Sequence, residues 1–373
     1  MDFGISEEQR DIQELARKIL GDLATPVRLA AYDNYASERF DEELWRQLAE
    51  AGLLGLAVPE EFGGMGFGFM ELALLSEEIG RTIAPVPVLS HLLGGVLPIC
   101  LFGSAEQKQR LLPGAVSGEQ LLSAALEEDA AVSVTTARAE AGGYRVSGEK
   151  FAVPFAHRAQ RVLIAAQTDG GVVVLLVDPA ASGVSCSAMK TTSYEPQSLL
   201  RMDHVRVEAA DVLAGPDRGA AVIGSITRHM TVALCAHQVG VTDSMLRQTA
   251  AYTSERKQFG VPIATFQAVG HRAANCFIDV ECLRLGTYQA ASLLAAGEAA
   301  VVETDIAKIW AGDVGHRVSY AAQHLHGGAG VDRGNTLWRY CLWARHNEMT
   351  LGSSAARLAV LGARCASGEA LID

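Results

Sequence analysis

The spacing of apolar residues changes twice along the chain, and this order of patterns restricts the fold more than any other feature of the sequence. Over residues 1–117 the apolar residues recur at a helical spacing. Over 118–218 short β-branched segments are separated by glycine-rich turns, and from 219 to 373 the helical spacing returns. We therefore expect an α+β protein with an N-terminal α-helical domain (1–117), a middle antiparallel β domain (118–218) and a C-terminal α-helical bundle (219–373).

Capping residues mark where the first helices should begin and end. Ser6 and Gln9 have the spacing of a capping box, in which each side chain accepts a hydrogen bond from the other residue's backbone amide. A second helix is expected from about Asp41 to a stop at Gly52, and a third over residues 69–80.

Four segments of the middle region carry the β-branched residues typical of strands, and glycines lie between them. They are Tyr144–Val153, Arg161–Thr168, Val172–Val177 and Leu199–Val207. Short strands at this spacing predict a small antiparallel sheet.

Composition excludes several classes of protein. The 373 residues are 49% hydrophobic and 20% charged, which supplies material for large cores and is unlike a disordered chain. A formal net charge of −12 argues against a non-specific nucleic-acid binder. The N-terminus lacks the regions of a signal peptide, and the apolar stretches fall short of the roughly 20 residues of a membrane span. We expect a cytoplasmic protein without a membrane span.

The seven cysteines do not indicate disulfides or a metal site. They are scattered, odd in number and without a CxxC pair. Reduced, buried thiols are the favoured interpretation for such a pattern. We therefore expect no bound metal.

Five local sequences carry a resemblance that no single one of them would support. They are Glu43–Gly55, Val58–Gly64, Leu200–Val207, Arg256–Ile263 with Phe266 and Gln267, and Gln323–Gly330. In this order, and each in its expected region, they make the chain resemble the acyl-CoA dehydrogenase family along essentially its whole length. The resemblance implies a C-terminal bundle that also serves oligomerisation.

The family resemblance implies a specific reaction, the α,β-dehydrogenation of an acyl-CoA thioester. In such enzymes a carboxylate removes a proton from Cα while a hydride leaves Cβ for the flavin N5. The site needs a positioned base and donors that polarise the thioester carbonyl. FAD carries the redox step, so the protein has to hold and orient it.

The residues with which family members contact the FAD of a neighbouring subunit are present. By resemblance, Arg256 reaches across a subunit interface to the FAD, and Gln267 contacts the same cofactor. Gln323 lies where the family lets the backbone approach the dinucleotide closely. The same resemblance assigns cofactor contact to Phe259, His326, Gly327 and Gly328. The alternative is that Arg256 pairs with Glu255 or Asp243 and that the glycines only end a helix.

Both positions at which the family places its catalytic base lack a carboxylate. Leu351 occupies the first position, in Met349–Ser354, and Met230 occupies the second, in the first long helix after the β domain. Two nearby residues could in principle substitute. Glu348 comes three residues before Leu351, and His229 could titrate near neutrality. Geometry argues against Glu348, and a lone histidine in an apolar helix is more often a core residue. We therefore assign no catalytic residue to this chain.

Two flavin-facing motifs of the β domain are also altered. The family's first loop corresponds to Leu126–Val134, which has lost its glycine. The second corresponds to Lys150–Phe155, where Pro154 replaces a hydroxyl residue and removes a backbone N–H as well.

Three functions fit this pattern. The first is a non-catalytic subunit of a heteromeric acyl-CoA dehydrogenase, which completes the FAD site of a catalytic partner. It resembles the partner subunit of actinobacterial two-plus-two heterotetramers that act on steroid side-chain CoA thioesters. The second is a homo-oligomeric dehydrogenase with a displaced base, Glu348 or His229. The third is a flavin-free scaffold or binding protein on the same fold.

Overall fold

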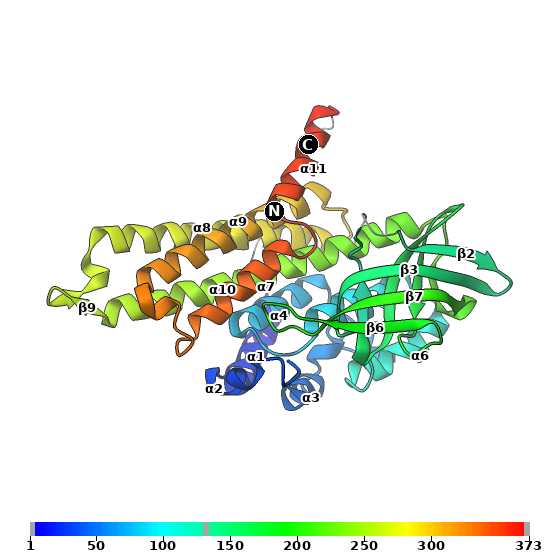
Figure 1. Ribbon diagram of the computed structural model, residues 1–373, viewed down its shortest axis with the longest axis horizontal. Coiled ribbons are helices and arrows are strands. Elements are labelled where there is room, and N and C mark those ends of the chain that lie inside the picture. The colour runs from blue at the N-terminus through cyan, green and yellow to red at the C-terminus, as the bar shows by residue number, and fades with distance from the viewer. Residues whose placement is uncertain (1–3, 130–133, 369–373) are drawn as a thin grey trace. The chain divides into compact units, whose positions relative to one another are not determined.

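The computed structural model describes residues 4–129 and 134–368 (Figure 1). By internal packing the chain divides into two compact units. The helical unit comprises Met1–Arg28, Ala73–Ala84 and Thr231–Asp373, and the sheet unit comprises Leu29–Leu72 and Pro85–Met230. Two helices, α4 (Phe69–Thr82) and α7 (Gly219–Glu255), run from one unit into the other. The predicted order of helices, strands and helices is therefore confirmed.

The sheet unit is built on eight strands with the order β6-β7-β3-β2-β4-β5-β8, and β1 pairs with β4 beside this path. The strands are β1 (Leu121–Ala125), β2 (Thr136–Glu140), β3 (Gly143–Pro154), β4 (Ala159–Thr168), β5 (Gly171–Val177), β6 (Val184–Met189), β7 (Gln197–Glu208) and β8 (Val212–Ala214). The four predicted strands correspond to β3, β4, β5 and β7. The sheet is mixed, because β1 and β2 each pair with β4 in parallel. The remaining pairs are antiparallel, as expected, and the two parallel pairs were not predicted.

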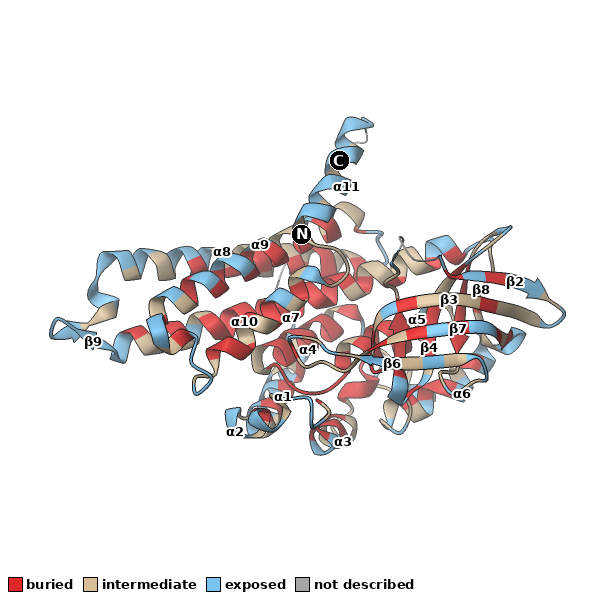
Figure 2. Cartoon of the chain, viewed as in Figure 1, coloured by how far each residue is buried: buried red, intermediate tan, exposed pale blue. Residues whose placement is uncertain are grey.

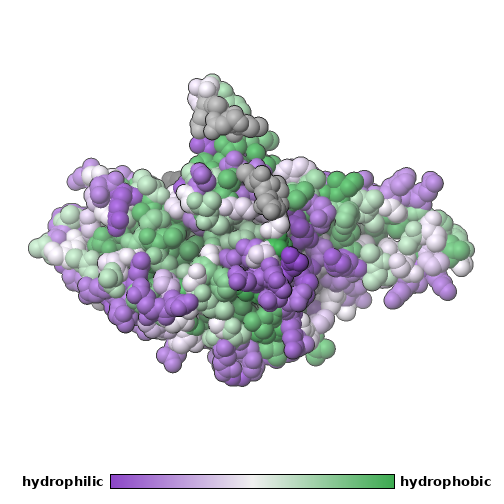
Figure 3. Space-filling model, turned by 180° about the vertical axis from the view of Figure 1, so that it is seen from behind, coloured by the Kyte–Doolittle hydropathy of each residue, from purple (hydrophilic) through white to green (hydrophobic). Residues whose placement is uncertain are grey.

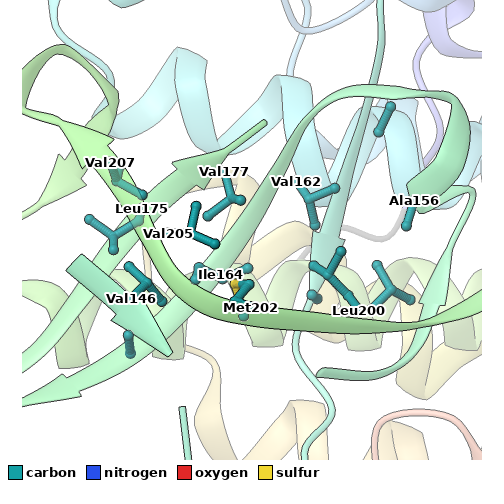
Figure 4. Packing of buried hydrophobic residues seen from close by; sticks show 14 of the residues in the cluster. Val146, Ala156, Val162, Ile164, Leu175, Val177, Leu200, Met202, Val205 and Val207 are labelled. Carbon is teal, nitrogen blue, oxygen red and sulfur yellow. The ribbon is translucent and has the colours of Figure 1, made fainter. Parts of the chain in front are cut away.

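The core of the sheet unit is a cluster of buried hydrophobic residues, most of which come from its strands (Figure 4). On β7 every second residue is buried, as at Leu200 and Met202. The next buried residue, Val205, comes three positions later, and the spacing of two then returns at Val207. The longer spacing falls at His204, which has a positive φ of 50°. Two residues of β7 there oppose one residue of β3, which is a β-bulge. The bulge returns the side chains after it to the buried face.

Helices cover part of this unit: α3 (Glu42–Glu50), α5 (Leu97–Phe102), α6 (Ala105–Val116) and the π-helix η4 (Leu89–Val96). As predicted, α3 begins after an Asp41 cap and ends before Gly52 in the left-handed region. His91 ties η4 in place, since its Nε2–H donates to Ala115 O and its Nδ1 accepts from the Leu122 amide, both at 3.1 Å. Complete burial lowers the pKa of His91 to about 4, so the ring is neutral.

The helical unit contains α1 (Glu7–Leu23), the later parts of α4 and α7, and α8 to α11. The last four are α8 (Gln267–Ala295), α9 (Val301–His326), α10 (Leu337–Met349) and α11 (Ser354–Ala366). The predicted capping box opens α1, with both reciprocal bonds formed between Ser6 and Gln9. Buried residues line the facing sides of α7, α9 and α10, whereas α11 has none (Figure 2).

Helices α4 and α7 approach each other closely at two glycines of the helical unit. A Cβ on Gly80 would lie 2.0 Å from His237 O, and one on Gly240 would lie 1.9 Å from Glu77 O. Beside this contact lies a buried ionic network. Glu77 accepts from Arg81 at 2.9 Å and from the Tyr288 hydroxyl at 2.8 Å, and it also pairs with Arg284. The network joins α4, α7 and α8 into one body.

Helix α7 is long and apolar enough to cross a membrane by length and composition, but 56% of its most apolar 18-residue window is buried inside the fold. The core helix of a globular domain has the same composition, because it too is surrounded by apolar groups. The seven cysteines are free thiols, but only Cys235, Cys276 and Cys341 are buried, so the predicted burial holds for three of them. Among residues 4–129 and 134–368, no group of histidines, cysteines or carboxylates is arranged to hold a metal ion.

Candidate functional site

Three segments of the helical unit meet at one end of its bundle, next to the β9–β10 hairpin (Figure 1). Near the end of α7, the Tyr252 ring stacks on the His326 ring at 4.3 Å, and its hydroxyl donates to His326 O at 3.3 Å. In the second turn of α8, Arg272 Nη1 donates to His324 Nδ1 at 2.6 Å. The C-terminal ends of α7 and α9 and the beginning of α8 are therefore held together. The cofactor residues predicted from the sequence lie on these helix ends or directly next to them.

Arg256 begins the connection from α7 to α8, and its side chain is exposed. The backbone is fixed by two bonds of 2.8 Å, from the Arg256 amide to Tyr252 O and from the Ile263 amide to Arg256 O. No ion pair joins Arg256 to Glu255 among the described residues, and the Asp243 carboxylate is bound by Arg81 and Arg247. The alternative of a surface ion pair is therefore not what the structure shows. The guanidinium is open to a ligand or a partner chain.

Residues after Arg256 form the two-stranded hairpin of β9 (Lys257–Gln258) and β10 (Val261–Pro262). Its turn consists of Phe259 and Gly260, with φ of 53° and 82°. Both values are positive, as a tight hairpin turn requires. The turn leaves Phe259 93% exposed, with its ring edge-on to Phe266 at 6.2 Å. An aromatic ring held this far out of the fold is suited to contact another molecule.

Gln267 is the first residue of α8 and is exposed. The residue before it, Phe266, offers no side-chain acceptor to the first amides of the helix. The positive end of the α8 dipole and its first N–H groups therefore lie beside Gln267. This end of the helix favours an anionic or carbonyl group.

The end of α9 carries the remaining predicted residues. Gln323 is half-buried, and Gly327 and Gly328 are exposed. Gly327 has φ 60° and ψ −137°, and it ends α9. His326 is 6% exposed, and its Nδ1–H donates to Ala322 O at 2.8 Å. The ring of His326 is thus engaged within the bundle, and the groups offered to a ligand are Gln323 and the glycine backbone.

The chemistry of this end fits a dinucleotide better than an apolar ligand. It combines an exposed guanidinium, two carboxamides, a helix N-terminus and a stretch of backbone without Cβ atoms. A guanidinium and helix amides bind diphosphate oxygens, and glycine allows close approach of the ligand to the backbone. These residues would hold part of an FAD.

The first base position of the family lies on a turn after α10. Leu351 and Gly352 both have positive φ, of 57° and 92°. A left-handed leucine costs about 1–2 kcal/mol, so its surroundings must impose this conformation. Arg357 does so, because its Nη2 and Nε donate to Leu351 O at 2.6 and 3.1 Å.

A buried polar network supports this turn from α9. Arg357 Nη1 also bonds Asp305 at 3.0 Å, and Asp305 is buried. Lys308, which is completely buried, donates to Asn347 O at 2.6 Å and to Glu348 O at 3.1 Å at the end of α10. The turn that presents residue 351 is therefore firmly held, although a leucine cannot accept a proton.

The two substitute bases have geometries that do not favour catalysis. The Glu348 carboxylate pairs with Arg345 one turn earlier on α10. His229 is buried, its Nδ1–H donates to Ser225 O at 2.9 Å, and its ring lies edge-on to Phe69 at 4.7 Å. Burial lowers the pKa of His229, and the neighbouring Arg228 charge lowers it further. His229 therefore has the contacts of a neutral core histidine.

Met230, at the second base position, is partly buried and packs near Gly94 of the sheet unit. Its Cε lies 3.5 Å from the position that a Cβ on Gly94 would take. The structure therefore supplies no carboxylate there.

The altered β-domain motifs lie in one region of the sheet unit. The buried Lys150 pairs with Glu128, and Glu128 also accepts from the Thr135 amide at 3.2 Å. Burial alone would raise the pKa of Glu128, but Lys150 and Thr135 hold it below its ordinary value. Residues 130–133 of the first loop lie outside the described residues.

Around Pro154 the backbone is strained. Ala152 and Phe155 have φ of 51° and 50°, and Phe155 is buried. The carbonyl of Pro154 accepts from Ser123 Oγ at 2.5 Å, within the protein. This segment offers neither a hydroxyl nor an amide at position 154 to a flavin.

Several residues of these sites could not be assigned from the sequence. Tyr252, Arg272 and Arg357 act through contacts with α9 that are distant along the chain. The one local signal was Tyr252, an aromatic residue in the last turn of α7, four residues before Arg256.

Comparison with known proteins is decisive at the level of the family. Residues 6–119 match the N-terminal domain of acyl-CoA dehydrogenases, and residues 217–366 match their C-terminal domain. The chain belongs to the acyl-CoA dehydrogenase family. The predicted fold class and family are thereby confirmed.

Relatives of known structure or sequence are similar over nearly their whole lengths. The acyl-CoA dehydrogenase FadE27 of Mycobacterium tuberculosis is 35% identical over 378 residues, which cover 99% of this chain and all of that protein. A chain of the ChsE4-ChsE5 complex from the same organism is 36% identical with a TM-score of 0.93, covering 99% of this chain and 100% of that chain. A chain of the Tcur3481-Tcur3483 steroid ACAD, in a G363A variant, is 40% identical with a TM-score of 0.90, covering 98% of this chain and 99% of that chain.

Proposed function

We propose that this acyl-CoA dehydrogenase is the non-catalytic subunit of a heteromeric, FAD-dependent enzyme, and that it completes the FAD site of a catalytic partner. The observation that carries the proposal is a division between two sets of residues. The groups that a subunit would use for its own reaction are replaced, as at Leu351, Met230 and Pro154. The groups that it would lend to a neighbour, Arg256 and Gln267 among them, are retained and exposed.

The geometry at the end of the bundle that carries Arg256 and Gln267 supports this division. Arg256, Phe259 and Gln267 project from the end of the bundle, where a neighbouring subunit can reach them. FAD, when bound, would accept the hydride that leaves the acyl group. This chain would contribute hydrogen bonds and positive charge to the dinucleotide.

Exposed apolar side chains of the bundle supply a surface for the partner. On α8, Phe277, Ile278 and Leu285 are each more than half exposed, and Tyr320 on α9 is 64% exposed. The face of the chain turned away in Figure 1 carries apolar patches among polar side chains (Figure 3). Large exposed apolar groups of this kind mark subunit interfaces. A subunit of the same fold is the partner we propose, in a two-plus-two assembly.

The proposed substrate is a steroid side-chain CoA thioester. Its support is similarity, since the Tcur3481-Tcur3483 protein is described as a steroid ACAD and is 40% identical to this chain. The two solved neighbours above are both named as pairs of different proteins, which also supports a heteromer.

The test is the flavin content of the complex. The chain is co-expressed with a candidate catalytic subunit, an acyl-CoA dehydrogenase that carries the glutamate base, and FAD is measured per protomer after purification. One FAD for every two chains supports the proposal. One FAD per chain contradicts it, because each subunit would then hold a complete site.

The displaced-base alternative makes a separate prediction for the chain purified alone. It requires bound flavin and turnover of an acyl-CoA by this chain without a partner, and it requires that Glu348→Gln or His229→Gln abolish that turnover. A flavin-free scaffold would yield no flavin-containing complex with any homologue. These results differ from the half-occupancy that we expect.

A further inference from the structure

Strand β6 forms one end of the eight-stranded sheet, and its outer edge is open. It pairs with β7 over six residues, whereas β8 at the other end of the sheet is only three residues long. Among the residues that the structure describes, no segment other than β7 bonds the backbone of residues 185–189. The open edge therefore presents a row of N–H and C=O groups that a second extended backbone can match along its whole length.

β6 lacks the features that keep most edge strands unpaired. Short length, charged side chains, proline and β-bulges are the common protections of an edge. The six residues of β6 include no charge and no proline, and their pairing with β7 continues without a bulge. The nearest charged side chain, Lys190, follows directly after the strand and lies over the Tyr35 ring at 5.3 Å. The edge is thus suited to pair with another strand.

A cavity of about 420 Å³ lies beside β6, where residues 34–39 face the strand. Cys186 and Ala188 line it from one face of β6, and Cys186 also packs against the core of the sheet unit. The lining includes the rings of Tyr35 and Tyr194, whose centroids are 4.9 Å apart. Apolar side chains of an added strand would therefore extend the core of the sheet unit into this cavity.

Hydrogen bonds hold residues 34–39 at the cavity and engage its carboxylates. The Tyr35 hydroxyl donates at 2.8 Å to a backbone carbonyl two residues after β6. Arg158 Nε donates to Glu38 at 2.6 Å, and Glu195 accepts a bond of 2.8 Å from a neighbouring carboxamide. Because these acidic groups already have partners, the cavity favours an uncharged ligand over a charged one.

We propose that the open edge of β6 binds an extended, uncharged peptide segment of another protein, which adds a strand to the sheet. The backbone of the segment pairs with residues 185–189, and every second side chain, an apolar one, enters the cavity beside Ala188. The intervening side chains are polar, since they lie next to Ser185 and Ser187, which are exposed. This interaction does not depend on the role proposed for the chain in an FAD complex.

The probe is a blocked seven-residue peptide in which threonine alternates with valine, added to the purified protein. Fluorescence anisotropy of the labelled probe measures its binding, and hydrogen exchange with mass spectrometry locates it. We expect the amides of residues 185–189 to exchange at least about tenfold more slowly when the probe is saturating. Methylating one alternate set of the probe's amide nitrogens should weaken binding at least about tenfold, and methylating the other set should not, because only every second amide of an added strand faces β6.

Ala188→Lys tests the cavity side of the edge. It places a positive charge beside the tyrosine rings and should weaken binding of the probe at least about tenfold. Ser187→Lys is the matched control, because it adds the same charge at the adjacent exposed residue on the other face of β6. It should bind the probe within about threefold of the wild type. Both replaced side chains are exposed, so the melting temperatures of the two variants should stay close to that of the wild type.

Several results would overturn the proposal. They are no binding of the probe by the wild type, binding that leaves the exchange of residues 185–189 unchanged, equal binding of the two methylated probes, and an equal loss for the two lysine variants. An edge that instead pairs with β6 of a second copy of this chain would give a dimer that Ala188→Lys dissociates. Sedimentation of the wild type and this variant detects that dimer, and its presence would likewise replace the peptide as the occupant of the edge.

Discussion

Substituting Arg256 by alanine tests whether this residue contacts the partner's FAD, and it should disturb the fold very little. The side chain is exposed and makes no hydrogen bond or ion pair with the described residues, so its loss should change the free energy of unfolding by no more than about 0.5 kcal/mol. In the complex the same change removes a charged hydrogen bond to the FAD of the partner. Such a bond contributes about 1.5–3 kcal/mol, so FAD should dissociate with a Kd about 10- to 150-fold higher.

The assay is a titration of the flavin-free complex with FAD, followed by flavin fluorescence. Lys257→Ala is the matched control. Lys257 is the neighbouring exposed residue on β9, and this substitution also removes one positive charge. We expect Lys257→Ala to bind FAD within about threefold of the wild type. Equal FAD affinity for Arg256→Ala and the wild type would refute the cross-interface role. A loss as large for Lys257→Ala would show that only the net charge of the hairpin matters.

Three further predictions concern the framework that holds these sites. Arg357→Met should lower the free energy of unfolding by about 3 kcal/mol, because it leaves the buried Asp305 carboxylate without its partner. Urea denaturation measures this change, and a value below about 1 kcal/mol would contradict a stabilising Arg357–Asp305 ion pair. The pKa of His91 is depressed to about 4, so its contribution to stability is complete above about pH 6.5 and is lost as the pH falls toward 4. It amounts to about 3 kcal/mol, and His91→Gln should flatten the pH dependence of unfolding over that window. Gly240→Ala should destabilise the protein by about 3 kcal/mol, because its methyl group would lie 1.9 Å from a backbone oxygen of α4. Gly286→Ala, in the open middle of α8, should instead stabilise the protein by up to about 1 kcal/mol. Equal melting temperatures for these two glycine variants would contradict the close packing of α4 on α7.

Local features of the sequence were sufficient for the elements whose signals lie within a few residues. The Ser6–Gln9 capping box and the Asp41 cap act through hydrogen bonds between neighbours in sequence, and both helices begin where predicted. Alternating β-branched residues likewise located β3, β4, β5 and β7. The parallel pairing of β1 with β4 was missed, because strand pairing depends on contacts between distant residues that local spacing does not encode.

The sequence by itself determined the family, the residues that are replaced and the residues that remain. The identity of residue 351 alone establishes that no proton acceptor stands there, since leucine has none. The tertiary structure decided which of the remaining groups are available to a ligand. Arg256 is exposed, whereas the His326 ring is stacked on Tyr252 inside the bundle, and no sequence pattern distinguishes these two outcomes.

The same holds for the residues that shape the sites from a distance. Arg357 imposes the left-handed turn at Leu351 only because of which helices lie beside it. Propensity and periodicity arise from interactions along one segment, so they predict helices and strands well. Burial and pairing of a charge depend on groups that are brought together by folding, and these could be read only from the tertiary structure.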